Sequence, residues 1–200
     1  MSQGTINSKG SIFVSDIGAL TNTGTITNYS TIVSNKAINN TNGTINNPGV
    51  ILANTDINGN APSGGTYYKP DSNTGVINVN TDMKLLPKTS FLIESGQSLV
   101  INSDAFTFDS SSTLTNEGTL ITSGASNNGT IINKNTILSN SDLGNVVDGT
   151  SGGTGTYYYP DPNNNDTITI SADFTLPAAA TFNVPNEVTL NIPNGKTFTF

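Results

Sequence analysis

The chain carries one apolar pattern twice, at a constant distance. Residues 77–79 (Ile-Asn-Val) return as 168–170 (Ile-Thr-Ile), and residues 99–101 (Leu-Val-Ile) return as 190–192 (Leu-Asn-Ile), in each case 91 positions later. A constant offset over so long a stretch means that both halves build the same supersecondary unit. We therefore expect a repeat protein rather than the single core of an ordinary globule.

Ile or Leu also recurs at a short period inside each copy. The steps are six to eight residues, whereas a helix would require steps of three and four. Phrases such as 24–28 (Gly-Thr-Ile-Thr-Asn) predict short strands with one inward apolar side chain, and Gly and Asn are expected to supply corners of positive φ. Three such strands form one coil of a parallel β-solenoid, about 18 to 24 residues long, and about nine or ten coils would stack at ~4.8 Å. The apolar positions of the first ladder are Ile6, Ile12, Leu20, Ile26, Ile32, Ile38, Ile45 and Ile51.

The period lengthens in the last part of each copy. Phe182, Leu190 and Phe198 are eight residues apart, with Pro or Gly between them. This spacing predicts a wider coil in which each strand directs two side chains inward.

These patterns predict an all-β fold, a parallel β-solenoid (β-helix) of two tandem repeats of about 90 residues. We place the first repeat at 1–110 and the second at 111–200, within one continuous solenoid. The Gly-rich and Asn-rich insertions at 58–65 and 144–155 are expected to be surface loops. Neither end of the pattern shows a helix, charge cluster or polar tail that would cap it.

Charge and composition exclude several classes of function. The net charge is −7, and all seven basic residues are scattered lysines, so the clustered cations that bind nucleic acid are missing. There is no Cys, and therefore neither a disulfide nor thiolate chemistry. No apolar run approaches the ~20 residues of a membrane span. The first residues, Met-Ser-Gln-Gly, do not resemble a signal peptide, so the route to a location outside the cell would be unknown.

Two longer phrases resemble a known kind of repeat. Residues 113–120 (Thr-Leu-Thr-Asn-Glu-Gly-Thr-Leu) and 188–200 (Val-Thr-Leu-Asn-Ile-Pro-Asn-Gly-Lys-Thr-Phe-Thr-Phe) resemble the Asn-x-Gly-Thr-Ile repeats of β-solenoid surface and filament proteins. Such repeats occur in bacterial adhesins and in viral or spore-surface fibres. The resemblance covers nearly the whole chain and implies an extracellular, surface-associated or particle-associated filament.

Catalysis is not expected. A solenoid enzyme of the pectin lyase type would need grouped acids with a nearby Arg or Lys, whereas this chain has no Arg and no His, and its acidic residues mostly stand alone. The sequence therefore predicts no catalytic and no cofactor-binding residues, and we expect the protein not to be an enzyme.

One segment offers oxygen ligands at alternating positions, as a calcium loop does. It runs from Asp161 to Asp166, but a calcium loop of the helix-flanked type requires Gly at its sixth position and Glu at its twelfth, where this chain has Asp166 and Ala172. A polar turn is the better interpretation, and no metal ligand is assigned. Weak calcium binding that stabilises the loops stays an open alternative.

Two aromatic pairs follow the expected surface loops. The phrase Thr-Tyr-Tyr-x-Pro-Asp occupies 66–71 and 156–161, and the second copy adds a third tyrosine. Tyr has an apolar body and a polar tip, which suits a lateral protein contact or stacking on a sugar. The alternative is that one tyrosine caps the core where the coil width changes and the other covers a corner. The five residues are Tyr67, Tyr68, Tyr157, Tyr158 and Tyr159.

The two ends of the pattern match each other. Residues 106–108 (Phe-Thr-Phe) continue into a Thr-Leu-Thr strand, so 198–200 (Phe-Thr-Phe) should continue into a segment like 2–6 (Ser-Gln-Gly-Thr-Ile). We therefore expect the chain to be a fibre subunit that stacks head to tail on itself, with no nucleic acid partner and no membrane insertion. The alternative is a segment of a longer adhesin or fibre shaft that binds a carbohydrate or protein. The predicted axial interface comprises Gly4, Thr5, Ile6, Thr197, Phe198, Thr199 and Phe200.

Overall fold

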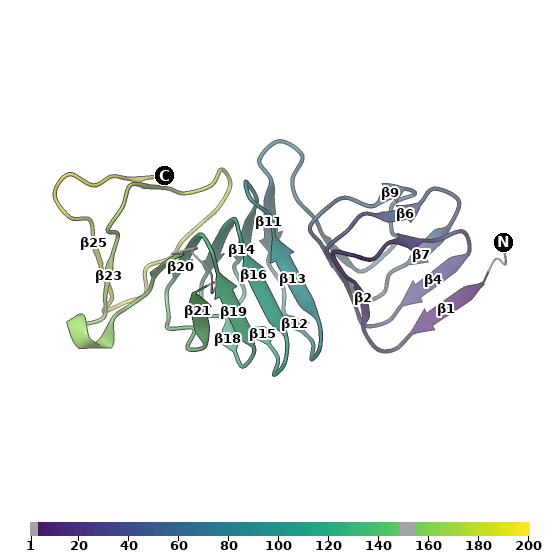
Figure 1. Ribbon diagram of the computed structural model, residues 1–200, viewed down its shortest axis with the longest axis horizontal. Coiled ribbons are helices and arrows are strands. Elements are labelled where there is room, and N and C mark those ends of the chain that lie inside the picture. Colours follow the sequence, from purple (N-terminus) through teal and green to yellow (C-terminus); the bar gives the residue numbers. More distant parts are fainter. Residues whose placement is uncertain (1–3, 149–154) are drawn as a thin grey trace.

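Parallel strands make up the computed structural model, each paired with the strand one coil earlier or one coil later (Figure 1). The structure describes residues 4–148 and 155–200. Within them the fold is an all-β solenoid of about nine turns, which confirms the fold class expected from the sequence. The strands fall into three sets that share no sheet, and we call these sets the N-terminal block (4–68), the middle block (76–158) and the C-terminal block (167–200).

The N-terminal block has three coils and three sheets, ordered β1-β4-β7, β10-β8-β5-β2 and β3-β6-β9. Its strands are β1 (Thr5–Ser8), β2 (Ile12–Val14), β3 (Leu20–Thr21), β4 (Thr25–Asn28), β5 (Thr31–Ser34), β6 (Ile38–Asn40), β7 (Thr44–Asn46), β8 (Val50–Ala53), β9 (Asn58–Gly59) and β10 (Thr66–Tyr68).

The middle block has sheets of five, three and four strands, ordered β11-β14-β17-β20-β22, β12-β15-β18 and β13-β16-β19-β21. Its strands are β11 (Val76–Val79), β12 (Met83–Leu85), β13 (Ser90–Ile93), β14 (Ser98–Ile101), β15 (Phe106–Phe108), β16 (Thr113–Asn116), β17 (Thr119–Thr122), β18 (Ser126–Asn127), β19 (Thr130–Asn133), β20 (Thr136–Ser139), β21 (Val146–Asp148) and β22 (Thr156–Tyr158).

The C-terminal block has two described sheets of two strands each, β23-β25 and β24-β26. A single 3-10 turn, η1 (Pro162–Asn164), precedes them. The strands are β23 (Thr167–Thr169), β24 (Phe174–Thr175), β25 (Thr189–Asn191) and β26 (Phe198–Thr199).

These blocks and the sequence repeats divide the chain at different places. The boundary drawn at 110/111 falls between β15 and β16, inside the middle block. Both expected loops also differ from prediction, because 58–65 contains β9 and 144–155 contains β21, while 149–154 lie outside the described residues. Backbone pairing to the neighbouring coil converts part of each insertion into strand.

Columns of identical side chains explain the register of the narrow coils. Ile6 pairs with Ile26, and Ile26 pairs with Ile45, so one isoleucine from each coil lies above the last. Ile26 and Ile45 are 1% exposed and belong to the core of the N-terminal block. Slipping the pairing by one residue would turn each isoleucine outward, so burial fixes the register.

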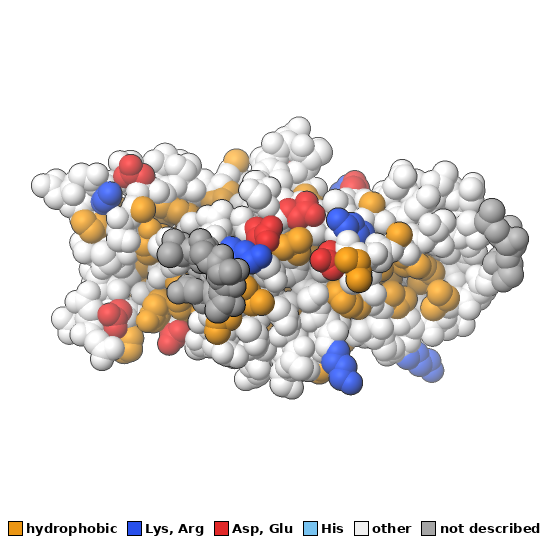
Figure 2. Space-filling model, in the orientation of Figure 1, with side chains coloured by type: hydrophobic (Ala, Val, Ile, Leu, Met, Phe, Trp, Pro, Cys, Tyr) orange, Lys and Arg blue, Asp and Glu red, His pale blue; other side chains and the backbone are white. Residues whose placement is uncertain are grey.

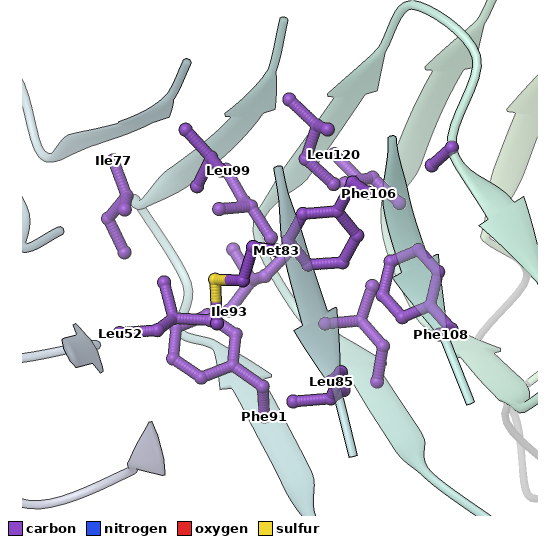
Figure 3. Close-up of a cluster of buried hydrophobic side chains, with 14 of the residues drawn as sticks. Leu52, Ile77, Met83, Leu85, Phe91, Ile93, Leu99, Phe106, Phe108 and Leu120 are labelled. Carbon is purple, nitrogen blue, oxygen red and sulfur yellow. The ribbon is translucent and has the colours of Figure 1, made fainter. Parts of the chain in front are cut away.

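The wider coils direct two side chains per strand inward, as their eight-residue period predicts. Phe91 and Ile93 on β13 are both buried, as are Phe106 and Phe108 on β15 (Figure 3). Coil length follows from the pairing partners, which are 23 residues apart at Ser90 and Thr113 but 17 residues apart at Thr113 and Thr130 of the narrow section. The larger aromatic residues therefore occupy the coils with the larger cross-section.

Buried asparagines bridge successive coils at the strand ends. Asn28 Nδ2 donates to Asn47 Oδ1 at 2.7 Å, and Asn47 Nδ2 donates to the carbonyl of Thr66 at 3.0 Å. The middle block repeats this ladder, with Asn116 Nδ2 donating to Asn133 Oδ1 at 2.8 Å and Asn133 Nδ2 to the Thr156 carbonyl at 3.1 Å. These contacts satisfy the buried amide N–H groups of both ladders, as buried polar groups require, whereas the buried Oδ1 of Asn116 has no hydrogen-bond partner among the described residues.

The glycines of the Gly-Thr-Ile phrases serve a different purpose from the one expected. Gly24 and Gly43 do not have positive φ; instead, they lie against the preceding coil. A Cβ at Gly24 would lie 2.0 Å from the carbonyl oxygen of Gly4. The expectation that these glycines form positive-φ corners was therefore wrong, because what they provide is close approach between backbones.

The blocks are joined by sheets that are apolar on both faces. In the first join sheet (β10-β8-β5-β2), Ile32 and Ile51 point into the N-terminal core, whereas Val33 and Leu52 pack with the core of the middle block. Figure 3 shows Leu52 beside Phe91 and Met83 at the start of that core. The outer face of one block therefore covers the open first coil of the next.

The second join has the same design. In the second join sheet (β11-β14-β17-β20-β22), alternate residues including Val100 and Leu138 point away from the middle core and pack with Ile168 and Phe174 of the C-terminal block. Figure 1 shows the three blocks in a row along the long axis, with the strands of the N-terminal block inclined to those of the middle block. The solenoid axis therefore bends where a join sheet lies across the next block.

Candidate assembly edges and tyrosine joins

The predicted N-terminal interface lies on an open strand edge. Thr5 and Ile6 are in β1, which pairs with β4 on one side and is the outermost strand of its sheet. Ile6 is 48% exposed although its column partner Ile26 is buried. The outermost strands of the other two sheets, β2 and β3, belong to the same first coil. This coil presents backbone donors and acceptors that have no strand partner among the described residues.

The predicted C-terminal interface is a second open edge, at the other end of the long axis (Figure 1). Thr197, Phe198 and Thr199 form or adjoin β26, which pairs only with β24. Phe198 is buried and stacks on Phe174 with ring centroids 5.6 Å apart, whereas Phe200 is 88% exposed. The two predicted end sets are therefore far apart within one molecule and do not form a single site.

A hollow of about 350 Å³ adjoins this C-terminal edge. Its walls are apolar except for Thr181 and Asn183, so its interior is the uncovered surface of the C-terminal core. It is lined by Leu176, Pro177, Ala178, Ala179, Ala180, Thr181, Phe182, Asn183 and Phe200.

One segment of the C-terminal block does not form the strand that its sequence repeat forms. Residues 181–184 lie 91 positions after 90–93, which are β13. β13 pairs with β16 along its whole length, with Ser90 opposite Thr113 and Ile93 opposite Asn116. Residues 181–184 have no strand partner in the described chain and are not strand. The difference between the copies is therefore a missing neighbour, because the apolar pattern itself is retained.

Tyr68 and Tyr158 are buried in the joins. Tyr68 is 7% exposed, and its hydroxyl accepts from the backbone N–H of Thr81 at 3.1 Å. Tyr158 is 4% exposed, and its hydroxyl accepts from the N–H of Ala172 at 3.2 Å. Each ring thus ties one block to the start of the next. The prediction that Tyr68 and Tyr158 make a lateral contact or bind a ligand is wrong, because both side chains are buried.

Tyr67 and Tyr157 cover the corner of the coil on which they pack. The hydroxyl of Tyr67 accepts from the N–H of Ile57 at 2.7 Å and donates to Asp56 Oδ1 at 2.8 Å. The hydroxyl of Tyr157 accepts from the N–H of Leu143 at 2.6 Å and donates to Asp142 Oδ1 at 3.2 Å. The two copies therefore use one hydrogen-bond pattern, which holds the residue just before each insertion, Ile57 or Leu143, against the solenoid.

These contacts shift the ionisation of the groups involved. Burial, and then the hydrogen bond to Asp56, raise the pKa of Tyr67 above its ordinary value. Burial raises the pKa of Tyr157 in the same way, with a further contribution from the Asp142 carboxylate. Burial alone would raise the pKa of Asp56, but hydrogen bonds from Lys69 and Tyr67 outweigh it and hold that pKa below its usual range. Both phenols stay protonated as donors at neutral pH.

Tyr159 extends outward from the second join. Its ring stacks on Tyr157 with centroids 4.3 Å apart and planes at 20°. A hollow of about 180 Å³ lies beside the pair and is also lined by Asp161 and Asn164. The first copy has Lys69 in place of this ring, paired with Asp56. The outward aromatic surface is therefore specific to the second copy.

Side-chain amides protect the first edge of the middle block. Asn35 Nδ2 donates to the carbonyl of Ser90 at 3.1 Å, while Asn35 Oδ1 accepts from the N–H of Leu92 at 3.0 Å. Gln97 Nε2 donates to the carbonyl of Asn54 at 2.7 Å across the same join. The Asn35 amide thus replaces the backbone of a missing strand. Sequence reasoning missed these residues, and no local motif distinguishes Asn35 from the many other asparagines.

The join sheets did have a signal in the sequence. Strands such as 98–101 (Ser-Leu-Val-Ile) and 50–53 (Val-Ile-Leu-Ala) are apolar at consecutive positions, which is typical of strands buried on both faces. The six-residue and eight-residue steps that predict the coils describe only the inward positions of these strands. The outward positions mark where one block covers another.

The carboxylates of the two acidic turns accept hydrogen bonds from backbone N–H groups of the same turn. Asp71 Oδ1 accepts from the N–H groups of Asn73 and Thr74, both at 3.0 Å, and these bonds lower the pKa of Asp71. Asp161 Oδ1 accepts from the N–H of Asn163 at 2.9 Å and caps η1. Within 4–148 and 155–200, no three His, Cys, Asp or Glu side chains come together in a group that could hold a metal ion.

The surface offers little charge and few special groups (Figure 2). Backbone and uncharged polar side chains together dominate the face shown, with Lys, Asp and Glu side chains of both signs among them, several of these near the middle of the view. In the described part of the chain, ion pairs join Lys69 to Asp56 and Lys134 to Glu117. No helix among these residues has the length and apolar character needed to cross a membrane. Family models, curated proteins and solved structures give no match to this chain.

Proposed function

We propose that the protein is a structural, non-catalytic fibre subunit whose first coil stacks on the C-terminal block of another copy. The observation that carries this proposal is the contrast between β13 and residues 181–184. The same pattern is a paired strand where a Thr-Leu-Thr-Asn strand lies next to it, and is unpaired where that neighbour is missing. β1 (Thr-Ile-Asn-Ser) has the pattern of that neighbour and is itself an unpaired edge at the other end of the molecule.

Exposed apolar residues at both ends support the same arrangement. Phe200, Val184 and Ile192 are exposed in the C-terminal block, although their equivalents in the middle block are fully buried. Ile6 is exposed in the first coil. Stacking a second copy would remove these side chains from water, which is favourable by about 25 cal/mol for each Å² of apolar surface.

Backbone pairing and charge also favour strand addition. An open edge strand presents a row of unpaired N–H and C=O groups that a second chain can satisfy. Residues 4–8 and 197–200 contain no charged side chain, so like charges would not be stacked at the ~4.8 Å strand spacing. The contact joins two different surfaces and does not close on itself, so it propagates as a filament.

Two substitutions and a matched control test the proposal. The purified chain is expected to form uniform fibres in negative-stain microscopy and to grow with concentration in light scattering. Phe200→Asp and Ile6→Asp should each abolish fibres while circular dichroism shows a folded monomer. Tyr29→Asp, at a 58% exposed position in the second coil, should leave fibres intact. A wild-type chain that stays a monodisperse monomer would contradict the proposal.

A second candidate function is carbohydrate binding by a segment of a longer adhesin or fibre shaft. The Tyr157–Tyr159 stack beside a hollow lined by Asp161 and Asn164 favours it, because sugars combine an apolar ring face with hydroxyl groups. Glycan-array binding that is lost in Tyr159→Ala and unchanged in Lys69→Ala would support this function. Lys69 is the matched position in the first copy, and equal binding by both variants would exclude the site.

A further inference from the structure

We infer that the junction between copies repeats, residue for residue, the β13–β16 register of the middle block. This inference rests on the proposed end-to-end assembly and specifies its geometry. In the middle block Ser90, Phe91, Leu92 and Ile93 face Thr113, Leu114, Thr115 and Asn116 in turn. The corresponding pairs at the junction are Thr181 with Thr5, Phe182 with Ile6, Asn183 with Asn7, and Val184 with Ser8 of the second copy.

The backbone of the middle block shows which hydrogen bonds this register would form. The N–H of Thr113 donates to the carbonyl of Thr89 at 3.0 Å, and the N–H of Glu117 donates to the carbonyl of Ile93 at 2.9 Å. At the junction, Thr5 N–H would donate to the carbonyl of Ala180, and Lys9 N–H to that of Val184. Both ends of the open edge are satisfied by backbone groups that lack a strand partner in the single molecule.

The next strand of the coil fits the same alignment. Ile12 follows Ile6 by six residues, as Leu120 follows Leu114. Leu120 pairs with Leu99, whose repeat equivalent is Leu190. Ile12 of the second copy therefore faces Leu190, and Val14 faces Ile192, which is 41% exposed in the single molecule. Two separate strands thus bring apolar residues of the two ends together, and all of these except the buried Val14 are exposed or half-exposed in the single molecule.

Gly4 allows the inferred junction to be tested separately from the fold of the single molecule. It begins a column of three glycines that continues through Gly24 and Gly43, because Thr5 pairs with Thr25, and Thr25 with Thr44. A Cβ at Gly24 would lie 2.0 Å from the backbone oxygen of Gly4. A Cβ at Gly43 would lie 2.6 Å from the backbone oxygen of Asn22. A Cβ at Gly4 would have no heavy atom within 4 Å. In the inferred register, Gly4 takes the position that Ser112 has in the middle block, where Ser112 is 1% exposed against the preceding coil, so a side chain larger than that of serine has no room there.

This difference separates folding from assembly. Gly4→Val introduces a side chain whose Cβ has no heavy atom of the described residues within 4 Å in the single molecule. The inferred junction has no room for it. We expect Gly4→Val to keep the wild-type circular dichroism and melting temperature and to lose fibre formation. Asn128→Val, at an exposed corner of the middle block, is the control and should form fibres normally.

Cysteine pairs test the register directly, because the chain contains no cysteine. Directly opposed residues of parallel strands have Cα atoms ~4.8 Å apart, within the range that a disulfide spans. Asn7→Cys combined with Asn183→Cys should give a ladder of covalent oligomers on non-reducing gels after mild oxidation. Asn7→Cys with Asn191→Cys places the second thiol on another strand and should give no ladder.

The possible outcomes separate this inference from the proposed function. Fibres that form with Gly4→Val, or that cross-link only through Asn191, would overturn the register while leaving end-to-end assembly intact. A wild-type chain that remains monomeric at all concentrations would overturn both. Loss of fibres in Gly4→Val together with the Asn7–Asn183 ladder would establish the register.

Discussion

Residues 76–108 of the middle block and 167–200 of the C-terminal block carry one apolar pattern in two surroundings. In the middle block Ile93, Ile101 and Phe108 are at most 1% exposed. Their equivalents in the C-terminal block, Val184, Ile192 and Phe200, are 39%, 41% and 88% exposed. The inward positions stay apolar in both stretches, so a loss of inward apolar residues does not cause the contrast. Outward positions do change, since Val76, Leu92 and Val100 correspond to Thr167, Asn183 and Asn191.

The contrast teaches that a coil of this solenoid is completed by its neighbour. Residues 76–108 are covered by the next coil of the middle block on one side and by the first join sheet on the other. Residues 167–200 are covered on one side only, by the second join sheet. A repeat protein derives its stability from such nearest-neighbour interfaces as well as from each unit. Strand formation at 90–93 and its absence at 181–184 follow from that dependence.

The largest effect should come from removing equivalent aromatic rings from the two stretches. Phe91→Ala deletes a fully buried side chain and should lower the free energy of unfolding by about 3–5 kcal/mol. Phe182→Ala deletes a half-exposed one and should lower it by about 1 kcal/mol in the monomer. Urea unfolding followed by tyrosine fluorescence measures both, and equal losses would mean that the C-terminal coil is as well covered as the middle one.

A buried amide ladder should produce the next largest difference. Asn133→Ala removes the donor to Thr156 and the acceptor of Asn116, leaving buried partners unsatisfied, so stability should fall by about 2–3 kcal/mol. Asn191→Ala, at an exposed position of the C-terminal block, should change stability by less than about 0.5 kcal/mol. Thermal unfolding of the two variants measures this difference. An Asn133→Ala variant as stable as the wild type would contradict the prediction.

Removing the amide cap on the first edge of the middle block should have a smaller effect. Asn35→Ala breaks two hydrogen bonds to β13 and should cost about 1–2 kcal/mol, with faster hydrogen exchange at the Leu92 amide. The corresponding contact of the C-terminal block, from Thr181 Oγ1 to Asn102 Oδ1 at 3.1 Å, is exposed. Asn102→Ala should therefore leave both stability and exchange nearly unchanged. Unaltered exchange at Leu92 in Asn35→Ala would show that the cap contributes nothing.

The smallest effect is expected from alkaline pH at the tyrosine corners. Because the folded-state pKa values of Tyr67 and Tyr157 are raised, their contribution is complete below the ordinary value of 10 and is lost as pH rises above it. The unfolded chain releases these protons first, so stability should fall by about 1 kcal/mol per tyrosine by pH 11. Tyr157→Phe should remove about half of this pH dependence between pH 9 and 11, because Tyr67 retains its own contribution. A wild-type curve that is already flat there would contradict the assignment.

The sequence predicted the coils because their geometry is local. Six-residue and eight-residue steps require one or two inward side chains per strand, and the Ile6–Ile26–Ile45 column shows this arrangement. The sequence predicts positive φ at Gly24, but this glycine instead allows close contact with the preceding coil. That contact cannot be predicted from one strand alone.

The sequence marks strands that are buried on both faces, but it does not show which block the outer face of each strand contacts, because that depends on which residues meet across blocks. Val33 and Leu52 follow inward residues directly, and nothing in one strand says what their outer face will contact. Asn35 caps an edge 55 residues away, and Tyr68 reaches the N–H of Thr81 in the next block. The constant repeat offset predicts one continuous solenoid and carries no information on the bend, which arises from covering the open end of each block with a sheet.

The two-faced join sheets also affect how the chain must be made. Residues 98–101 and 119–122 are continuous β-forming stretches without charge or proline, which is the composition of segments that form amyloid when exposed in unfolded chains. In the native state both faces of these strands are buried, and each edge is paired to another coil. During synthesis, the middle block is protected only after its neighbours have folded onto it. Refolding yield should therefore fall steeply with chain concentration, and slow elongation through the second join sheet would favour the soluble product.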